Sequence, residues 1–240
     1  MTTLPRRPPT VVAGACRAPW GAAADGLPGA APPALPNVPG FVTSRFSPLV
    51  AAAVDACLGE PDGDRDPVAG RGERTAIVLA TMCGDTTTTD TATRRMVAGQ
   101  VHSPLLFFQS VTTSVLGHLG RRYGITGPVS CVSDGAGLAA EALRLAEVVL
   151  DDPWLEQVLV VGVDVAAEER VTWAREHTDR TYPLGPLPRG DAVVALLLRR
   201  GDEADGPSPV PGPAAPAPSG YGWLAPLVAL CPGTGPRTTV

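Results

Sequence analysis

Residues 125–146 have the sequence ITGPVSCVSDGAGLAAEALRLA, and this stretch decides the fold. A Gly-Pro pair leads into a short strand-like run, which is followed by a Gly-rich turn and an apolar helix. The apolar positions of the helix recur at spacings of four, three and four, which places them on one face: Leu138, Ala142, Leu145 and Val149. A strand that turns tightly into a helix is a form that presents nucleophiles in enzymes. The stretch therefore predicts a strand-to-helix elbow whose turn is made of Asp134, Gly135, Ala136 and Gly137.

Three further apolar runs have no polar alternation: residues 76–82, 157–165 and 192–198. Such runs are typical of strands that are buried on both faces. Helices are expected around them, at residues 48–58, about 91–98 and 110–123. Strands that alternate with helices predict a layered α/β fold with a mostly parallel central sheet that is flanked by helices.

The two ends of the chain differ in composition from its middle. Residues 1–40 and 201–220 are so rich in Pro and Gly that no regular element is expected there. The periodic hydrophobicity predicts one ordered domain over residues 41–200. Residues 201–240 are expected to form a Pro-rich linker and an apolar tail, whose YGWLAPLVAL stretch (residues 221–230) can dock on the domain or on a partner.

The composition argues against several classes of protein. Of the 240 residues 44% are hydrophobic, but no apolar run approaches the roughly 20 residues that cross a bilayer. The N-terminus lacks the apolar core of a secretory signal, so a cytoplasmic location is expected. The net charge of −5 and the lack of a basic patch argue against binding to nucleic acid. The sequence contains no lysine, which excludes lysine Schiff-base chemistry.

The five cysteines are odd in number, scattered, and form no C-x-x-C pair. Reduced and mostly buried thiols are therefore expected, rather than a disulfide framework or a metal site.

Several segments resemble, in their order, the first half of a β-ketoacyl synthase of the thiolase fold: QVHSPLLFFQSVTTSVLGHLGRRYGITGP, the elbow, VLVVGVDV and PRGDAVVALLLRR. The likeness covers about residues 42–200. It is strongest with short ketosynthase-like proteins that are described as chain-length-factor or N-terminal-like domains. The resemblance implies a thiolase-like half-fold.

The resemblance also implies where the chemistry would lie. Ketosynthases carry a cysteine at the elbow, where the N-terminus of the next helix lowers the thiol pKa, and this cysteine accepts an acyl group from an acyl carrier protein. Counted from Gly127-Pro128, the position falls on Ala136, and alanine cannot attack a thioester. The catalytic histidines, or histidine and asparagine, of the family's second half are not expected here, because a Pro-rich tail stands where that half would start.

Cys131 and Ser133 are the alternative nucleophiles. Cys131 stands in the strand-like run, where a small, buried side chain is the simpler interpretation. VSDGAG does not match the G-x-S-x-G elbow, and Ser133 and Asp134 are better explained as N-cap residues of the helix.

The three histidines are candidates for a general base. His118 and His102 could in principle pair with Cys131 or Ser133, but a hydrogen-bonded structural role is the expectation for both. His177 lies in the charged REHTDR stretch and is expected at the solvated surface.

Two polar features near the helices remain. GDTTTTDT (residues 84–91) lacks the pattern and the lysine of a phosphate loop, so helix-entry capping is expected. Two arginine pairs are expected on solvated helix faces; the alternative is contact with an acidic helix or the phosphopantetheine phosphate of a carrier protein: Arg94, Arg95, Arg121 and Arg122.

Two functions remain open. In the first, the chain is a non-catalytic ketosynthase-like subunit of fatty-acid or polyketide synthesis, which pairs through its sheet edge and elbow helix with a ketosynthase and helps to bound the acyl tunnel. In the second, it is an enzyme that processes a carrier-bound acyl thioester by transfer, decarboxylation or hydrolysis. An oxyanion hole would then come from amides at the elbow, at Gly135, Ala136 and Gly137.

The first function is favoured because no nucleophile, base and orienting group can be assembled from the sequence. The expected partners are a ketosynthase and an acyl carrier protein, in a hetero- or homodimer, and neither nucleic acid nor a membrane. No cofactor is expected beyond the phosphopantetheine arm of the carrier protein. A half-fold would also leave an apolar sheet face, which a partner or the tail around Trp223 must cover.

Overall fold

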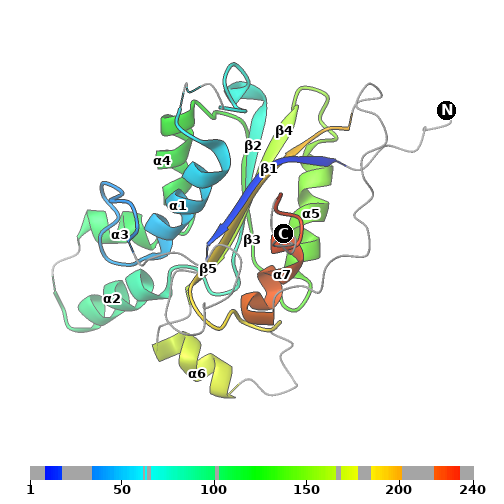
Figure 1. Ribbon diagram of the computed structural model, residues 1–240. Helices are drawn as coiled ribbons and strands as arrows, with labels where there is room; N and C mark the ends of the chain where they lie inside the picture. Colours follow the sequence, from blue (N-terminus) through cyan, green and yellow to red (C-terminus); the bar gives the residue numbers. More distant parts are fainter. Residues whose placement is uncertain are drawn as a thin grey trace.

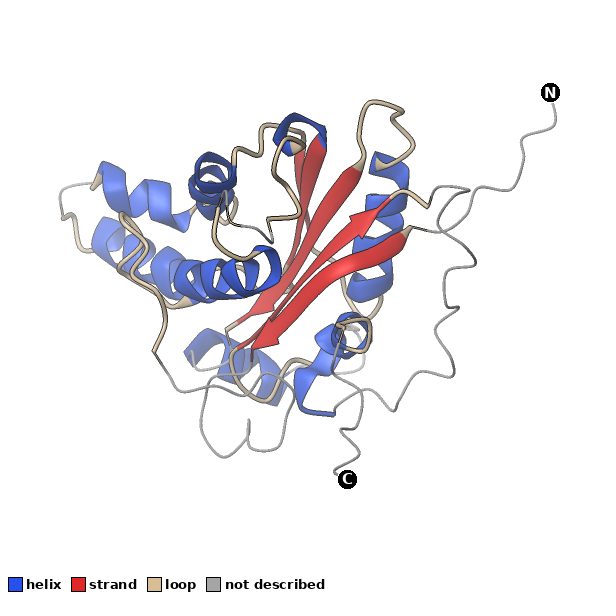
Figure 2. Ribbon diagram, turned by 45° about the horizontal axis from the view of Figure 1, so that its top comes forward, coloured by secondary structure: helices blue, strands red, loops and turns tan. Residues whose placement is uncertain are grey.

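The chain, described here by a computed structural model, centres on one five-stranded sheet with helices on both faces (Figures 1 and 2). The structure describes residues 9–17, 34–61, 63, 66–100, 103–165, 169–177, 185–201 and 219–232. The strands lie side by side in the order β1 (Thr10–Arg17), β5 (Ala192–Arg199), β4 (Gln157–Asp164), β2 (Thr75–Ala80) and β3 (Val129–Val132). The predicted layered α/β architecture is confirmed.

The sheet is mixed, whereas the sequence predicted a mostly parallel one. β4, β2 and β3 pair in parallel, and β5 runs antiparallel to both of its neighbours, β4 and β1. Of the described strands, four therefore point the same way and β5 is reversed. The hydrophobic pattern could not reveal this, because a strand that is buried on both faces has the same apolar run in either direction.

Three strands coincide with the predicted apolar runs, but β1 was not predicted. It lies within residues 1–40 and pairs with β5 from Thr10 opposite Arg199 to Arg17 opposite Val193. The prediction that residues 1–40 contain no regular element is therefore wrong. Pro-rich neighbours had hidden a short strand, TVVAGACR, whose place at the edge of the sheet requires only one strand partner.

The helices differ from prediction mainly at their ends. α1 (Phe46–Leu58) and α5 (Leu138–Val149) lie where expected. α2 (Thr86–Val97) begins earlier than predicted because the Asp85 side chain caps it, accepting a hydrogen bond from the amide of Thr88 at 3.0 Å. This outcome confirms the capping role that was predicted for GDTTTTDT.

The single helix expected over residues 110–123 is two helices, α3 (Pro104–Ser110) and α4 (Ser114–Tyr123). Val111 between them is extended, and Gly124 ends α4 in the left-handed conformation. The remaining helices are α6 (Glu169–His177) and the short α7 (Ala225–Val228), and 3₁₀ turns form at Gly72–Arg74 and Ser219–Leu224. None of the helices in the described part of the chain has the length and apolarity to cross a membrane.

Helices α1 and α4 cover one face of the sheet (Figure 1). Ile77, Leu79 and Leu159 of the sheet point toward them and are fully buried. From the helices come Phe46, Leu49, Leu116 and Leu119, which are also buried.

The opposite face is covered by α5 together with residues 219–232, which we call the C-terminal segment (Figure 1). Five large side chains of this segment are buried against the sheet and α5: Tyr221, Trp223, Leu224, Leu227 and Val228. Burying each such side chain stabilises the fold by about 1.5–3 kcal/mol. The prediction that the apolar tail docks on the domain is thus confirmed, and this sheet face is not left bare.

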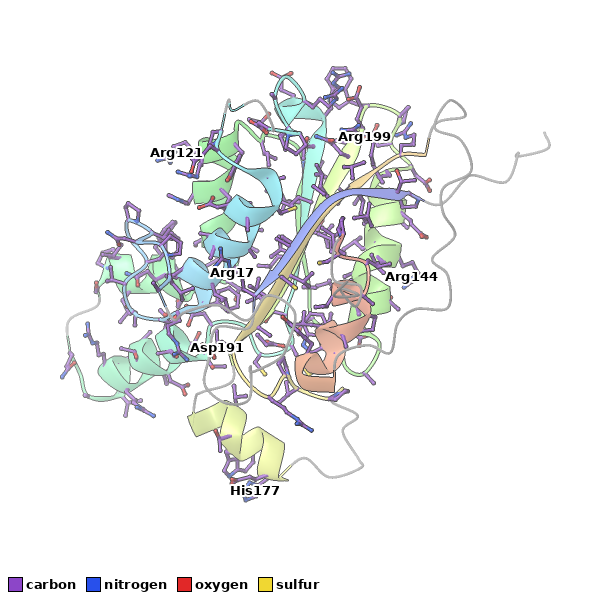
Figure 3. All side chains as sticks on the ribbon, viewed as in Figure 1. Arg17, Arg121, Arg144, His177, Asp191 and Arg199 are labelled. Carbon is purple, nitrogen blue, oxygen red and sulfur yellow. The ribbon has the colours of Figure 1, made fainter. Side chains whose placement is uncertain are left out.

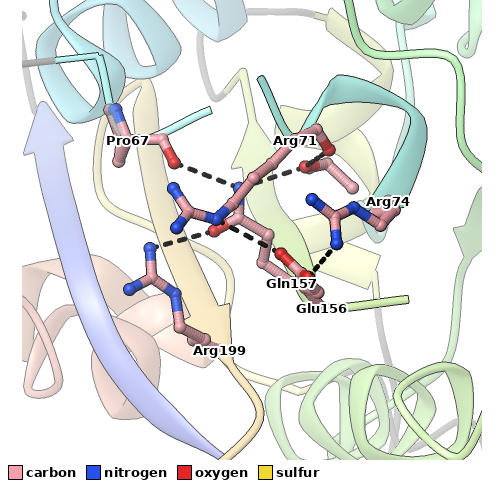
Figure 4. Close-up of polar contacts among 7 residues, drawn as sticks. Pro67, Arg71, Arg74, Glu156, Gln157 and Arg199 are labelled. Carbon is pink, nitrogen blue, oxygen red and sulfur yellow. Dashed lines mark hydrogen bonds and ion pairs between the residues drawn. The ribbon is translucent and has the colours of Figure 1, made fainter. Parts of the chain in front are cut away.

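A polar cluster fixes the end of the sheet where β2 and β4 begin (Figure 4). Gln157 is fully buried and donates hydrogen bonds to the Pro67 carbonyl at 3.2 Å and to the Thr75 hydroxyl at 3.1 Å. Arg199 donates to the Gln157 side-chain oxygen at 3.3 Å. The neighbouring Glu156 forms ion pairs with two arginines that lie just before β2, Arg71 and Arg74. These contacts satisfy the buried amide and tie β5 to β4, so the cluster is structural.

Gly162 of β4 shows how closely the C-terminal segment packs. A Cβ atom at this position would lie 2.6 Å from Cδ2 of Leu224 and 3.0 Å from Cδ1 of Leu227. The backbone of β4 is therefore in direct contact with the segment, and a side chain at position 162 would displace it.

Replacing Gly162 with alanine should lower the stability of the protein by about 1–3 kcal/mol, because the added methyl group overpacks the contact with the C-terminal segment. Thermal unfolding measures the change. Gly117→Ala is the matched control, since a Cβ atom at this exposed helix position meets no atom within 4 Å. Equal melting temperatures for the two variants would contradict the close packing.

Truncation before Ser219 tests the same contact more severely. It exposes the sheet face that the segment covers, so the truncated protein should lose solubility or change its oligomeric state, as measured by size-exclusion chromatography with light scattering. A truncated chain that stays soluble in the same oligomeric state would show that the segment is dispensable.

Candidate functional site

The predicted elbow lies at the end of the sheet where β2, β3 and β4 finish and β5 begins. The registers pair Ala80 with both Val132 and Gly162, and Asp164 with Ala192, so these strand ends adjoin one another. Loops after the carboxyl ends of parallel strands are where α/β proteins commonly place binding sites. The elbow, the loop after β2 and the C-terminal segment all meet there.

The elbow connects β3 to α5 as the sequence predicted, but the capping is different. α5 begins at Leu138, its N-cap is Gly137, and no side chain caps it. The prediction that Ser133 and Asp134 are N-cap residues is therefore wrong: the turn continues for three residues beyond Asp134 before the helix starts at Leu138. Ala136 and Gly137 are exposed at this uncapped helix end.

The backbone of Ala136 is approached closely by Gly185. A Cβ atom on Gly185 would lie 2.9 Å from the Cα of Ala136 and 3.4 Å from the carbonyl oxygen of Gly135. It would also lie 3.3 Å from Cε of Met82. The segment that begins at residue 185 therefore packs directly on the elbow, and a glycine is required for that approach.

Cys131 does not take part in the elbow turn. It is paired with Leu79, whose side chain points to the face covered by α1 and α4, so Cys131 points to that face and away from α5. The expectation that it is buried is wrong, since it is exposed on an edge strand. Partial burial of its thiol nevertheless raises the pKa above the usual value for cysteine. Cys131 is therefore a poor nucleophile at neutral pH.

Ser133 follows β3 and is exposed. Its hydroxyl donates a hydrogen bond of 3.4 Å to the carbonyl oxygen of Met82, which ties the elbow to the loop after β2. A carbonyl oxygen cannot take the hydroxyl proton, so this contact positions the loop and does not activate the serine.

Asp164 is the buried polar centre of this end of the sheet, with only 2% of its surface exposed. One carboxylate oxygen accepts hydrogen bonds from the Thr81 hydroxyl at 2.9 Å and the Cys83 amide at 3.0 Å. The other accepts from the Met82 amide at 3.2 Å and the Trp223 indole at 2.5 Å. Burial raises the pKa of Asp164, while the four donors act in the opposite direction.

Asp164 thereby joins the loop after β2 to the C-terminal segment. The segment is held further by the Trp223 amide, which donates to the Pro186 carbonyl at 2.6 Å. Asp164 and its partners were not predicted from the sequence. The available signal was the acid that interrupts VLVVGVDV, since a carboxylate within a buried apolar run needs several donors.

A second buried acid, Asp191, lies at the start of β5, in the GD pair of the PRGDAVVALLLRR stretch (Figure 3). It forms an ion pair of 2.5 Å with Arg45, the residue before α1. The contact joins the first helix to the last strand and is structural.

The histidines do not assemble a catalytic base at the elbow. His118 is half-buried on α4, which covers the sheet face opposite α5. His177 is exposed on α6, where its ring stacks on Trp173 with 4.6 Å between the centroids (Figure 3). This position confirms the predicted surface role of His177. His102 lies outside the described residues.

The four arginines are exposed at helix ends, as predicted, but they form no single patch. Arg94 and Arg95 lie in the last turn of α2, and Arg121 and Arg122 in the last turn of α4. These helices occupy separate places on the molecule (Figure 1). Arg122 is already paired with Asp55 at 3.2 Å, whereas Arg121 extends into solvent (Figure 3). In the described part of the chain, no group of three or more His, Cys, Asp or Glu residues is arranged to hold a metal ion.

Replacing Asp164 with asparagine should destabilise the protein by about 2–3 kcal/mol. One acceptor oxygen would be replaced by an NH₂ group, which cannot accept the hydrogen bonds of the buried donors that face it. For a chain of this size the melting temperature should fall by about 5–10 °C. Asp152→Asn is the control, because Asp152 is exposed and asparagine can accept the same turn hydrogen bond from the Trp154 amide. If both variants unfold at the wild-type temperature, the Asp164 network does not stabilise this end of the sheet.

The comparisons with known proteins come from structure alone. No family model and no curated protein sequence matches the chain. A ketosynthase in complex with its chain length factor from Xenorhabdus doucetiae matches with a TM-score of 0.57 and 20% identity, over 82% of this chain and 81% of that one. The ishigamide ketosynthase/chain length factor matches with a TM-score of 0.61 and 20% identity, over 84% of this chain and 64% of that one.

A third match is a type II polyketide synthase acyl-carrier protein in complex with its ketosynthase bound to the hexaketide, with a TM-score of 0.58 and 13% identity. The match covers 81% of this chain and 58% of that one. The chain thus spans less than two thirds of the length of the second and third of these proteins. At such identities the matches establish the fold. The chain therefore has the thiolase-like fold of the ketosynthase and chain-length-factor structures, as the order of its segments predicted.

Proposed function

We propose that this protein is a non-catalytic, chain-length-factor-like subunit that pairs with a ketosynthase in polyketide or fatty-acid synthesis. The observation that carries the proposal is the elbow, in which an alanine, Ala136, stands exposed at the N-terminus of α5. The turn, the uncapped helix and the close approach of Gly185 form a site for a reactive side chain, and a methyl group occupies that place. A methyl group can line an acyl tunnel but cannot carry the acyl chain.

The other thiols support this proposal. Cys131 points to the other face of the sheet and has a raised pKa. Cys83 is half-buried in the loop after β2, where its amide donates to Asp164. Neither is placed at the N-terminus of α5, where the helix dipole would lower a thiol pKa.

The free edge of β3 is the first candidate surface for the partner. Among the described strands, β3 pairs only with β2, so its outer side presents unpaired backbone groups. Val129 is half-exposed there, and Val148 is exposed on the adjoining α5. Edge strands pair readily with another chain, and the ketosynthase would extend the sheet.

A second surface is formed by α2 and α3, which pack on each other. Half of the twelve large apolar side chains that are exposed in the described part of the chain lie on these helices or directly after α3: Met96, Val97, Leu105, Phe107, Phe108 and Val111. Clusters of exposed apolar side chains mark interaction sites. The ketosynthase subunit is the occupant we propose for this surface.

The acyl carrier protein is a further proposed partner, through Arg121 and the arginines at the end of α2. Carrier proteins present an acidic helix and a phosphopantetheine phosphate, and arginine binds both kinds of acceptor.

The second candidate function, processing of an acyl thioester, is favoured by one observation. The first turn of α5 has no side-chain cap, so the amides around Ala136 are available to bind an oxyanion. Decarboxylation of a malonyl thioester needs such donors but no nucleophile.

Purified protein incubated with malonyl- or acyl-loaded carrier protein should show neither an acyl adduct by intact mass nor loss of carbon dioxide from the thioester. Cys131→Ala and Ser133→Ala are analysed in parallel. Ala136→Cys serves as the control for access, since a thiol at this helix N-terminus should be alkylated readily by iodoacetamide. An adduct that disappears in either alanine variant would overturn the non-catalytic function, and so would loss of carbon dioxide that persists in both variants.

Co-expression with any ketosynthase that is encoded beside this protein should give a co-purifying heterodimer. Val129→Lys places a charge on the β3 edge and Phe107→Lys places one on the α2–α3 surface, and each should weaken recovery of the partner about tenfold or more if its surface is in the interface. Trp173→Lys, an exposed aromatic residue on α6, is the matched control. A stable monomer that recovers no ketosynthase would contradict the proposed pairing.

A further inference from the structure

Strand β1 and the end of the C-terminal segment meet on the sheet face that α5 covers. Cys16 of β1 and Cys231 are both buried in the same apolar cluster. A Cβ atom on Gly14 would lie 2.9 Å from Cδ of Pro232. Residues two apart on a strand point to the same face, so Gly14 and Cys16 both face the stretch that contains Cys231 and Pro232. Two segments more than 200 residues apart in the sequence are thus in contact at a pair of cysteines.

The two thiols interact directly. The Cys16 sulfur accepts a hydrogen bond from the Cys231 thiol, and the Tyr221 hydroxyl also contributes one. The bond to Cys231 lowers the pKa of Cys16 to about 7, despite its burial. The same interaction raises the pKa of Cys231. Cys16 is therefore the more readily ionised thiol of the pair, and Cys231 is the less readily ionised one.

We propose that Cys16 and Cys231 form a reversible disulfide bond that locks the C-terminal segment onto the sheet. The oxidant is a low-molecular-weight disulfide such as oxidised glutathione. The Cys16 thiolate attacks one sulfur of the oxidant, forms a mixed disulfide and releases one thiolate, which takes up a proton. The Cys231 sulfur then attacks Cys16, gives up its proton and releases the second thiol. The protein loses two hydrogens, and the oxidant is reduced to two thiols.

The surroundings favour ionisation of Cys16 over that of Cys57 and Cys131. Burial raises the pKa of Cys57 to about 12, and partial burial raises the pKa of Cys131. Thiolate content favours attack on a disulfide, so the lower pKa of Cys16 favours its reaction over that of Cys57 and Cys131. Pro232, next to Cys231, is exposed, which places the pair close to solvent.

The disulfide bond would hold the C-terminal segment against the sheet. It would close one loop from residue 16 to residue 231, and bonds that close long loops restrict the unfolded chain most. The oxidised protein would keep its C-terminal segment docked, whereas the reduced protein holds it by packing and by hydrogen bonds, among them those of Trp223 to Asp164 and to the Pro186 carbonyl.

The full-length protein incubated with oxidised glutathione at neutral pH should lose the mass of two hydrogens without gaining glutathione. Peptide mapping without reduction should recover one cross-linked pair that contains Cys16 and Cys231. The melting temperature should rise on the order of 10 °C and return to its starting value with dithiothreitol.

Cys16→Ser and Cys231→Ser should each abolish the mass loss and the stabilisation, whereas Cys131→Ser, the control at an exposed thiol, should retain both. The proposal is overturned if wild-type protein gains only bound glutathione, cross-links another pair, or stays fully reduced while a denatured sample under the same conditions is oxidised. These outcomes are measured on the wild type and do not depend on whether the serine variants fold. They are also independent of pairing with a ketosynthase.

Discussion

The carboxylate of Asp164 holds together the end of the sheet on which the rest of the structure depends. Its four donors come from the loop after β2 and from Trp223, so one buried group connects the central strands to the C-terminal segment. A buried carboxylate is costly unless its oxygens are satisfied, and here both accept two hydrogen bonds. Because of this connection, Tyr221, Leu224 and Leu227 are buried over β4 and β5 in place of bare sheet.

The sheet face that α5 and the C-terminal segment cover is relevant to the proposed function, because the elbow leads into α5. In this fold the helix that follows the elbow lies on the same face as the C-terminal segment, and the two together close the apolar layer. The elbow has a turn, a helix and the close approach of Gly185, and Ala136 at the start of the helix carries only a methyl group. In the proposed function this packing, without a nucleophile, would shape a partner's tunnel, and the exposed β3 edge and α2–α3 surface are the places proposed for that partner.

Much of the fold could be predicted from the sequence, because its strongest signals are local. The apolar runs of β2, β4 and β5 and the spaced leucines and alanines of α5 are set by burial and helical periodicity. The predictions failed where a neighbouring strand decides whether a segment forms a strand or whether a side chain is buried. β1 forms because β5 offers it an edge, and Cys131 is exposed because β3 has no outer neighbour among the described strands. The direction of β5 could not be predicted from its local sequence either, because a strand that is buried on both faces has the same apolar pattern in a parallel and in an antiparallel sheet.

The sequence by itself determined the elbow, the alanine in its turn, the layered α/β class and an apolar tail able to dock. Each of these follows from residue type and spacing, which act over a few residues. Only the tertiary structure decided where the tail docks, which acid anchors it, and that Cys16 and Cys231 meet. These features join residues that are far apart in the sequence, and their free energy comes from burial and hydrogen bonds that exist only once the sheet has brought them together.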